Sequence, residues 1–522
     1  MNKIIIALLT TIALLPSLQS TRAGSATWNL NPTTNAWNTA ANWTPATVPN
    51  SSSDVATFDV SNTTDVSLSG AVTVNSIVFT ENASAFLISA DLYDLKITGA
   101  GLTNDSGNLQ QFLVPVNSAG AHGTMEFFNN ASAGAATAFT LQGSVITADP
   151  GIINFWNNAT AGNASFTLEG GGTGARTAGG RVVFNDTSSA ANATFDIQGG
   201  EDGNFGATLA YVGFYDSATA GNAVFTVEGS RDQTGNGFGG AVSFSDQSTA
   251  DHATLIAKGA KILDGGSLSF SGSAQANNAT VKLIGSGILI NFVPDLTIGS
   301  LEGNGLVLLA DDMVIGQNNA STIFDGLIYE TGSITKIGSG TLALTHDNTF
   351  TGGVTVRRGV LLVNNISGSG TGPGPVQVQG GTLGGNGSIE GPVTVGTGGS
   401  QRASIAPGRD GAGLLTMQST LSFGTNGTYN WNVDTVSAKS DGLVANGVAI
   451  SAGATFTIFP GHRAALPIGT VFTVIDNQAV TPISGTFSNL SDGGTILVGN
   501  NNTLQANYEG GDGNDLTLTV VP

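Results

Sequence analysis

Large aromatic residues recur along the middle of the chain at a nearly constant interval, and this interval limits the folds open to it. Successive units are 27, 29, 30, 30 and 26 residues apart, and a second apolar residue follows the first after 11 residues. The pairs are Phe128 and Phe139, Phe155 and Phe166, Phe184 and Phe195, Phe214 and Phe225, Phe244 and Leu255, and Phe270 and Val281. A unit this short cannot bury its apolar face alone, so each unit must stack on the next.

Short segments of alternating apolar and polar residues flank each loop, as in Ala-Val-Phe-Thr-Val at residues 223–227. Alternation with a period of two is typical of half-buried strands. We therefore predict an all-β fold, a right-handed parallel β-helix (solenoid), with its repeat units at about residues 123–290. An antiparallel array of hairpins, with each loop as a hairpin turn, is the alternative.

The same register aligns a polar column eight residues after each phenylalanine. Its members are Asn163, Asn192, Asn222 and Asn278, with His252 in the fifth unit. Asparagine tolerates the left-handed conformation of a sharp corner, and stacked amides hydrogen-bond along a ladder. We expect these residues at the corners of successive coils.

Composition excludes several classes of protein. Only 10% of residues are charged and 75 of the 522 are glycine, but only 15 are proline, which fits neither collagen nor a disordered polar chain. The net charge of −20 argues against a nucleic-acid partner. The chain has no cysteine, which rules out disulfides and thiolate metal sites.

The first residues have the three regions of a secretory signal peptide. Lys3 precedes an apolar run at residues 4–15, and small or polar residues lead to Ala23. We predict a signal peptide at residues 1–23, an exported product on the cell surface, outside the cell or in the periplasm, and no transmembrane helix in the mature chain.

The ends of a solenoid expose unpaired strand edges and need covers. Residues 24–65 carry three of the five tryptophans and are predicted to form an N-terminal β cap. The β-helix is predicted over residues 66–420. Residues 421–522 are predicted to form a β-rich C-terminal cap or sandwich.

One segment resembles a known repeat. Gly-Ser-Gly-Thr-Leu-Ala-Leu at residues 338–344, Asn-Thr-Phe-Thr-Gly-Gly at 348–353 and Gly-Val-Leu-Leu-Val at 359–363 follow one another. This pattern is similar to the autotransporter-associated β-strand repeat, here spanning about residues 332–364. The resemblance implies a passenger-type parallel β-helix of a Gram-negative-type bacterium. The family's C-terminal translocator barrel has no counterpart in this sequence, so the route across the outer membrane is not indicated.

Five carboxylates are candidate metal ligands. Asp186, Asp216 and Asp246 each lie two residues past their phenylalanine, after Asn130 and Asn157 in the earlier units. Stacked like charges repel unless they are hydrated or bridged by a cation such as Ca²⁺. Asp512 and Asp515 lie in Gly-Gly-Asp-Gly-Asn-Asp, which resembles one Ca²⁺-binding nonapeptide of a β-roll and also suits a turn before the last strand.

Two further features bear on function. Trp37 and Trp43 either stack on sugars or form the core of the cap. The four histidines are scattered, and neither a His-Glu-x-x-His nor a Gly-x-Ser-x-Gly motif occurs, so we expect no enzyme and no cofactor.

The sequence thus favours a non-catalytic, adhesin-like surface or extracellular-matrix protein, a stalk whose partners are glycans or cell-envelope components. The alternative is an exoprotein that binds or degrades polysaccharide on a β-helix scaffold.

Overall fold

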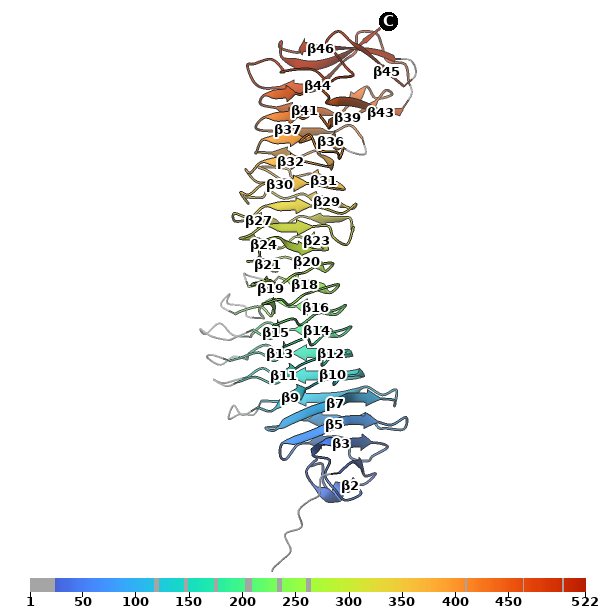
Figure 1. Cartoon of the computed structure of the whole chain (residues 1–522), viewed down its shortest axis with the longest axis vertical. Helices are drawn as coiled ribbons and strands as arrows, with labels where there is room; N and C mark the ends of the chain where they lie inside the picture. Colours follow the sequence, from blue (N-terminus) through green and yellow to red (C-terminus); the bar gives the residue numbers. More distant parts are fainter. Residues whose placement is uncertain are drawn as a thin grey trace, which may run out of the picture.

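The protein is a long stack of short strands with a cap at each end (Figure 1). The computed structural model describes residues 24–116, 122–144, 149–172, 177–201, 209–231, 237–259, 264–408, 411–462, 464–499 and 502–522. The predicted signal peptide, residues 1–23, lies outside the described residues. Within them the only helical segment is a 3-10 turn, η1 (Ala40–Asn42), and no helix is long and apolar enough to cross a membrane.

Equivalent strands of successive coils pair in parallel and form long ladders. The first ladder contains, in pairing order, β2 (Trp43–Thr44), β1 (Ala26–Trp28), β3 (Ser51–Phe58), β5 (Val72–Phe79), β7 (Asp94–Asn104), β9 (Thr124–Phe127), β11 (Ile152–Phe155), β13 (Arg181–Phe184), β15 (Tyr211–Phe214), β17 (Ala241–Phe244), β19 (Ser267–Phe270), β21 (Ile288–Asn291), β24 (Leu306–Leu309) and β27 (Leu327–Tyr329). All pairs in it are parallel except β1 with β2.

A second ladder runs along another side of the stack. It contains β4 (Asp65–Ser67), β6 (Leu87–Ser89), β8 (Gln110–Val114), β10 (Ala135–Leu141), β12 (Asn163–Leu168), β14 (Thr194–Ile197), β16 (Val224–Val227), β18 (Thr254–Lys258), β20 (Thr280–Ile284), β23 (Ser300–Gly303), β26 (Thr322–Phe324), β29 (Thr341–Leu344), β31 (Val360–Val363), β33 (Gly381–Gly385), β36 (Ala403–Pro407), β39 (Gly427–Asp434), β43 (Thr455–His462) and β40 (Lys439–Ser440), which forms a hairpin with β39. The parallel pairing confirms the β-solenoid and excludes the array of hairpins.

Later coils have a third strand. This ladder contains β22 (Leu296–Ile298), β25 (Met313–Ile315), β28 (Ile334–Lys336), β30 (Val354–Val356), β32 (Val376–Val378), β35 (Val393–Val395), β38 (Leu421–Phe423) and β42 (Val448–Ile450). In earlier coils the same side is reduced to single bridges that link Ser132, Thr160, Ser189, Thr219, Thr249 and Gln275.

The phenylalanines pile up as predicted. Phe184 stacks on Phe214 at 4.7 Å between ring centroids, and Phe214 on Phe244 at 4.7 Å, with ring planes within 8° of parallel. A second column runs beside it, with Phe195 and Phe225 4.7 Å apart. Rings of the two columns meet edge to face, so the core is continuous from coil to coil.

The first unit is out of register with the prediction. Phe127, and not Phe128, pairs with Phe155 and stacks on it at 4.9 Å. Phe128 faces outward and stacks on Trp156. The unit therefore holds one extra residue before Phe139, and β10 absorbs it in a bulge between Ala135 and Ala138.

The asparagine column forms the predicted amide ladder. The Asn192 amide donates to Asn163 Oδ1 at 3.0 Å, and Asn222 donates to Asn192 Oδ1 at 3.1 Å. The left-handed residue of each corner is the one before this column, however, as at Ala191, with a φ of 51°. The corner conformation assigned to the asparagines is therefore wrong by one position, whereas their stacking is confirmed.

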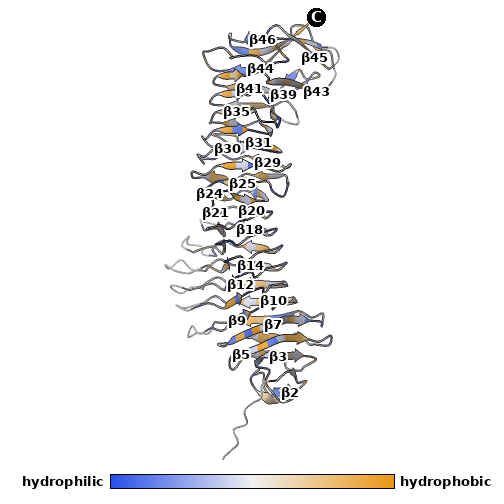
Figure 2. Cartoon of the chain, in the orientation of Figure 1, coloured by the Kyte–Doolittle hydropathy of each residue, from blue (hydrophilic) through white to orange (hydrophobic). Residues whose placement is uncertain are grey.

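Parallel pairing extends into both predicted caps. Parallel pairing already joins β1 to β3, ahead of residue 66, and continues past residue 420 as far as β44 (Val471–Asn477). Beyond β44 the last strands pair in the antiparallel sense. The sheet at this end contains β34 (Ser388–Ile389), β37 (Leu414–Met417), β41 (Gly442–Ala445), β44, β47 (Asp515–Val521), β46 (Asn502–Gly510) and β45 (Thr495–Val498). Figure 2 shows hydrophobic and hydrophilic residues alternating along the strands from end to end.

Candidate functional site

The predicted aspartate column is a ladder of backbone contacts. Asp186, Asp216 and Asp246 have φ values of 56°, 52° and 57°, in the left-handed region. The backbone N–H of Asp186 donates to Asp216 Oδ2 at 3.0 Å, and that of Asp216 donates to Asp246 Oδ2 at 3.2 Å. Each of these two carboxylates, Asp216 and Asp246, thus accepts a hydrogen bond from the backbone of the coil before it.

The first member of the aspartate column differs from the prediction by one residue, because the first unit is out of register. Asn129, and not Asn130, precedes Asn157, and its backbone N–H donates to Asn157 Oδ1 at 3.1 Å. Asn157 in turn donates its backbone N–H to Asp186 Oδ2 at 2.8 Å. Within the described ranges, no group of three or more His, Asp or Glu side chains is arranged to hold a metal ion.

Asp512 and Asp515 lie at the last hairpin. Asp512 is exposed in the turn between β46 and β47, which pair in the antiparallel sense. Asp515 is buried, and its Oδ1 accepts the backbone N–H of Asn477 at 2.9 Å. Burial raises the pKa of the Asp515 carboxyl. The segment is thus the turn before the last strand, the second of the two roles considered for it.

Trp37 and Trp43 do not offer a surface for sugars. Both are buried, with 0% and 1% of their surface exposed. Trp37 Nε1 donates to the Pro49 carbonyl at 3.1 Å, and Trp43 Nε1 donates to the Trp37 carbonyl at 2.7 Å. Trp43 packs edge to face with both Trp37 and Phe58, and Trp37 also contacts Phe58, so both tryptophans form the core of the N-terminal cap.

Lys336 and Asp441 are buried charged residues with shifted pKa values, and neither was singled out from the sequence. Lys336, in β28, occupies an inward position that Ile315 and Val356 fill in the adjacent coils. Its ammonium group donates to the carbonyls of Ile337 and Gly338 in the following turn, and burial lowers its pKa to about 8. The sequence does contain a signal for this position: in Ile-Thr-Lys at residues 334–336, Lys336 lies two residues after the buried Ile334 and so faces the same side of the strand.

Asp441 is the second buried charge. Its carboxylate accepts N–H groups from Gly413 at 2.9 Å and from the backbone and side chain of Asn432 at 2.9 and 2.8 Å. Burial raises the pKa of this carboxyl to about 6 in spite of these donors. Because its oxygens are occupied by the chain itself, Asp441 ties neighbouring coils together.

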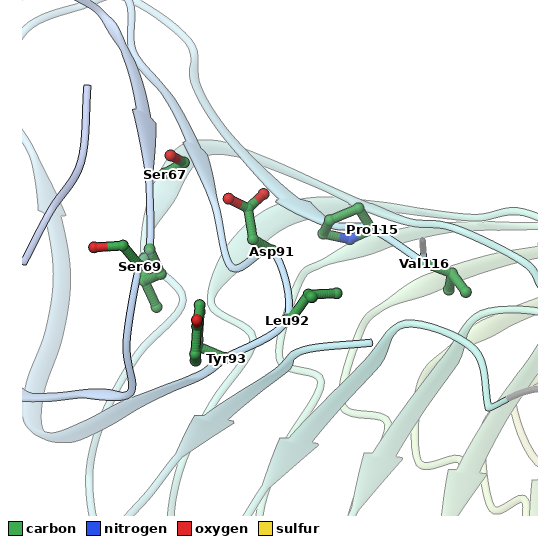
Figure 3. A pocket seen from close by; sticks show the side chains of 8 residues that line it. Ser67, Ser69, Asp91, Leu92, Tyr93, Pro115 and Val116 are labelled. Carbon is green, nitrogen blue, oxygen red and sulfur yellow. The ribbon is translucent and has the colours of Figure 1, made fainter. Parts of the chain in front are cut away.

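A surface cavity of about 500 Å³ lies near the N-terminal end (Figure 3). Three successive corners build it, those that follow β4, β6 and β8. The Leu68 N–H donates to the Ser89 carbonyl at 3.0 Å, and the Ala90 N–H donates to the Leu113 carbonyl at 2.9 Å, which holds the corners one above another. The lining residues are Ser67, Leu68, Ser69, Asp91, Leu92, Tyr93, Pro115 and Val116.

This pocket combines apolar walls with one acid. Leu92 and Tyr93 are 43% and 39% exposed, which is unusual for large apolar side chains that lie side by side. Asp91 sits before them in the left-handed region, with a φ of 49°. Ser89 Oγ donates to Asp91 Oδ1 at 2.6 Å, which orients the carboxylate. A small ligand fits a cavity of this size.

A parallel β-solenoid with inward columns of apolar residues and self-bonded corners is thus the class of protein that the fold defines. A family model, passenger-associated-transport-repeat, matches residues 334–363. This match confirms the resemblance of the segment at about 332–364. The chain therefore carries a passenger-type repeat within its solenoid.

Two known proteins are similar to parts of the chain. The adhesin BmaC autotransporter of Brucella suis biovar 1 (strain 1330) is 36% identical over 115 residues, which is 22% of this chain and 3% of that protein. The crystal structure of the Haemophilus influenzae Hap adhesin aligns with 90% of this chain and 63% of its own, at 12% identity and a TM-score of 0.30. The strand pairing of the chain itself defines its fold. The match spans only 3% of the length of the BmaC adhesin.

Proposed function

We propose that the chain is an exported, non-catalytic and adhesin-like protein whose solenoid acts as a stalk at the surface or in the extracellular matrix of a Gram-negative-type bacterium. The observation that carries the proposal is the buried core, which continues from coil to coil and makes one rigid rod of the solenoid. The passenger-type repeat and the similarity to an autotransporter adhesin support export and adhesion.

The outward polar columns support a structural role. The side chains of the aspartate and asparagine ladders form hydrogen bonds with the neighbouring coil. Asp441 and Lys336 likewise contact backbone groups of their own chain. These hydrogen bonds hold the side chains in place and join neighbouring coils, which supports a structural role for them.

Surface display is tested on cells that produce the full chain. Intact cells are treated with an external protease, and the loss of the protein is followed with an antibody against residues 24–522. We expect loss from intact cells, whereas protection until the outer membrane is opened would contradict a surface location. Attachment of beads coated with residues 24–522 to glycan and envelope surfaces then measures adhesion.

The alternative, polysaccharide degradation, is tested on the same purified chain. Incubation with a panel of polysaccharides, followed by an assay for reducing sugars, is expected to give no product above the buffer control. Sugar release that scales with protein concentration would overturn the non-catalytic role while leaving the export proposal intact.

A further inference from the structure

The pocket described above has one source of charge. Asp91 is the only ionisable acid among the eight lining residues, and none of them is a lysine, arginine or histidine. In the part of the chain that the structure describes, no ion pair involves Asp91. Figure 3 shows its carboxylate directed toward the space between Ser67 and Pro115. The pocket thus presents a carboxylate that the protein itself does not neutralise.

Apolar side chains cover the remainder of the pocket. Leu92, Pro115 and Val116 line one side, and Tyr93 contributes an aromatic ring. The next coil supports this corner from beneath at Gly123, where an added Cβ would lie 2.6 Å from the Tyr93 carbonyl oxygen. Only glycine allows this close approach, so the position of the corner is set by the solenoid.

We propose that this pocket binds the side chain of a lysine from a partner polypeptide. The ammonium group pairs with the Asp91 carboxylate and donates to the Ser67 hydroxyl. The methylene stem packs on Leu92, Pro115 and Val116, and the Tyr93 ring attracts the cation. The net charge of −20 on the chain favours the approach of a basic partner.

Two features distinguish this occupant from others. A purely apolar side chain would leave the carboxylate desolvated and unpaired, which is costly. A trimethylammonium group has no N–H to donate to Asp91 and Ser67, so a choline headgroup would use only part of the site. The inference is independent of the stalk proposal, because it concerns one pocket and not the export or shape of the chain.

The test measures binding of Nα-acetyl-lysine methylamide to purified residues 24–522 by NMR, following the Leu92 methyl and Tyr93 ring signals. The norleucine analogue has the same stem without the ammonium group, and choline serves as the second comparison. We expect the lysine probe to bind about tenfold more tightly than either. Equal binding of the norleucine analogue, or tighter binding of choline, would overturn the proposal.

Asp91→Asn removes the charge, keeps the shape and suits the left-handed backbone, because asparagine tolerates that conformation. We expect it to weaken the lysine probe about tenfold without a change in melting temperature. Asp295→Asn is the matched control, since Asp295 is exposed and also left-handed, with a φ of 55°. The proposal fails if Asp91→Asn binds the probe as the unchanged protein does, or if both variants weaken it equally.

Discussion

Two regions of the solenoid fill their buried core with different kinds of side chain. The aromatic coils, β9 to β20, have two strands per turn, and paired residues such as Phe214 and Phe244 lie 30 positions apart. The aliphatic coils, β22 to β38, add a third strand, and Ile334 pairs with Val354 only 20 positions later. Stacked aromatic rings fill the coils that have two strands, whereas mostly aliphatic side chains fill the coils that have three.

The comparison shows where a lysine enters the core. In the aromatic coils the two columns of rings meet edge to face, and alanines such as Ala193 and Ala223 fill the space behind the corner. In the aliphatic coils the third strand places one lysine, Lys336, among isoleucine and valine. Ring stacking leaves little tolerance for such an exchange, because both faces of each phenylalanine are covered.

The largest effect is expected from breaking the aromatic column. Phe214→Ala removes a ring that stacks on both Phe184 and Phe244, and we expect it to cost about 3–5 kcal/mol locally. Leu361→Ala in the aliphatic coils should cost less, about 2–3 kcal/mol, because Leu342 and Leu383 can move into the space. Hydrogen exchange of β13 to β17 and of β29 to β33 measures each local opening. Equal losses would contradict the difference between the regions.

The second prediction concerns the buried lysine of the aliphatic coils. The pKa of Lys336 is about 8 in the folded chain and about 10.5 when unfolded, so the unfolded state binds more protons between these values. Stability should therefore rise as the pH increases from about 8 to about 10.5. Lys336→Met should lose this rise, and melting temperatures across that range measure it. Lys282→Met, at a half-exposed lysine, is the control and should keep the slope.

A smaller effect is expected at the aspartate ladder of the aromatic coils. Asp216→Ala puts an alanine at a φ of 52° and removes the acceptor for the Asp186 N–H, which should cost about 1–2 kcal/mol. Asp216→Asn keeps both the backbone preference and an acceptor oxygen, so we expect a change below about 0.5 kcal/mol. A large loss in the asparagine variant would show that the charge itself is needed.

The smallest effect is expected from chelation. Because the ladder carboxylates already accept backbone N–H groups, excess EDTA should shift the melting temperature by no more than about 1 °C. A fall of several degrees that added Ca²⁺ reverses would establish ion bridging at Asp186, Asp216 and Asp246. Such a result would also separate the two regions further, since the ladder is confined to the aromatic coils.

Much of the architecture could be predicted because it repeats. The stacking of Phe184, Phe214 and Phe244 follows from a pattern that recurs at a nearly fixed interval, and the passenger-type repeat follows from the motif of a single segment. The first unit could not be placed in register, because the bulge in β10 is a local event that leaves no periodic signal. The assignment of Phe128 to the column was wrong for this reason.

The candidate site was less accessible from the sequence. Ser67, Asp91 and Val116 come from three corners that only stacking brings together. They show no shared motif, because each corner contributes two or three residues of different kinds. For Trp37 and Trp43 the sequence left two roles open, sugar stacking and the core of the cap, and the pairing of β1, β2 and β3 buries both side chains.

By itself, the sequence determined the repeat, the strand character and the identity of the inward columns, since alternation and a fixed interval are local properties of the chain. Only the tertiary structure decided the exact register of each coil, where parallel pairing gives way to the antiparallel end sheet, and which corners form a pocket. These features depend on contacts between residues that lie a whole coil apart. The free energy of such contacts depends on both coils and cannot be inferred from the sequence of one repeat alone.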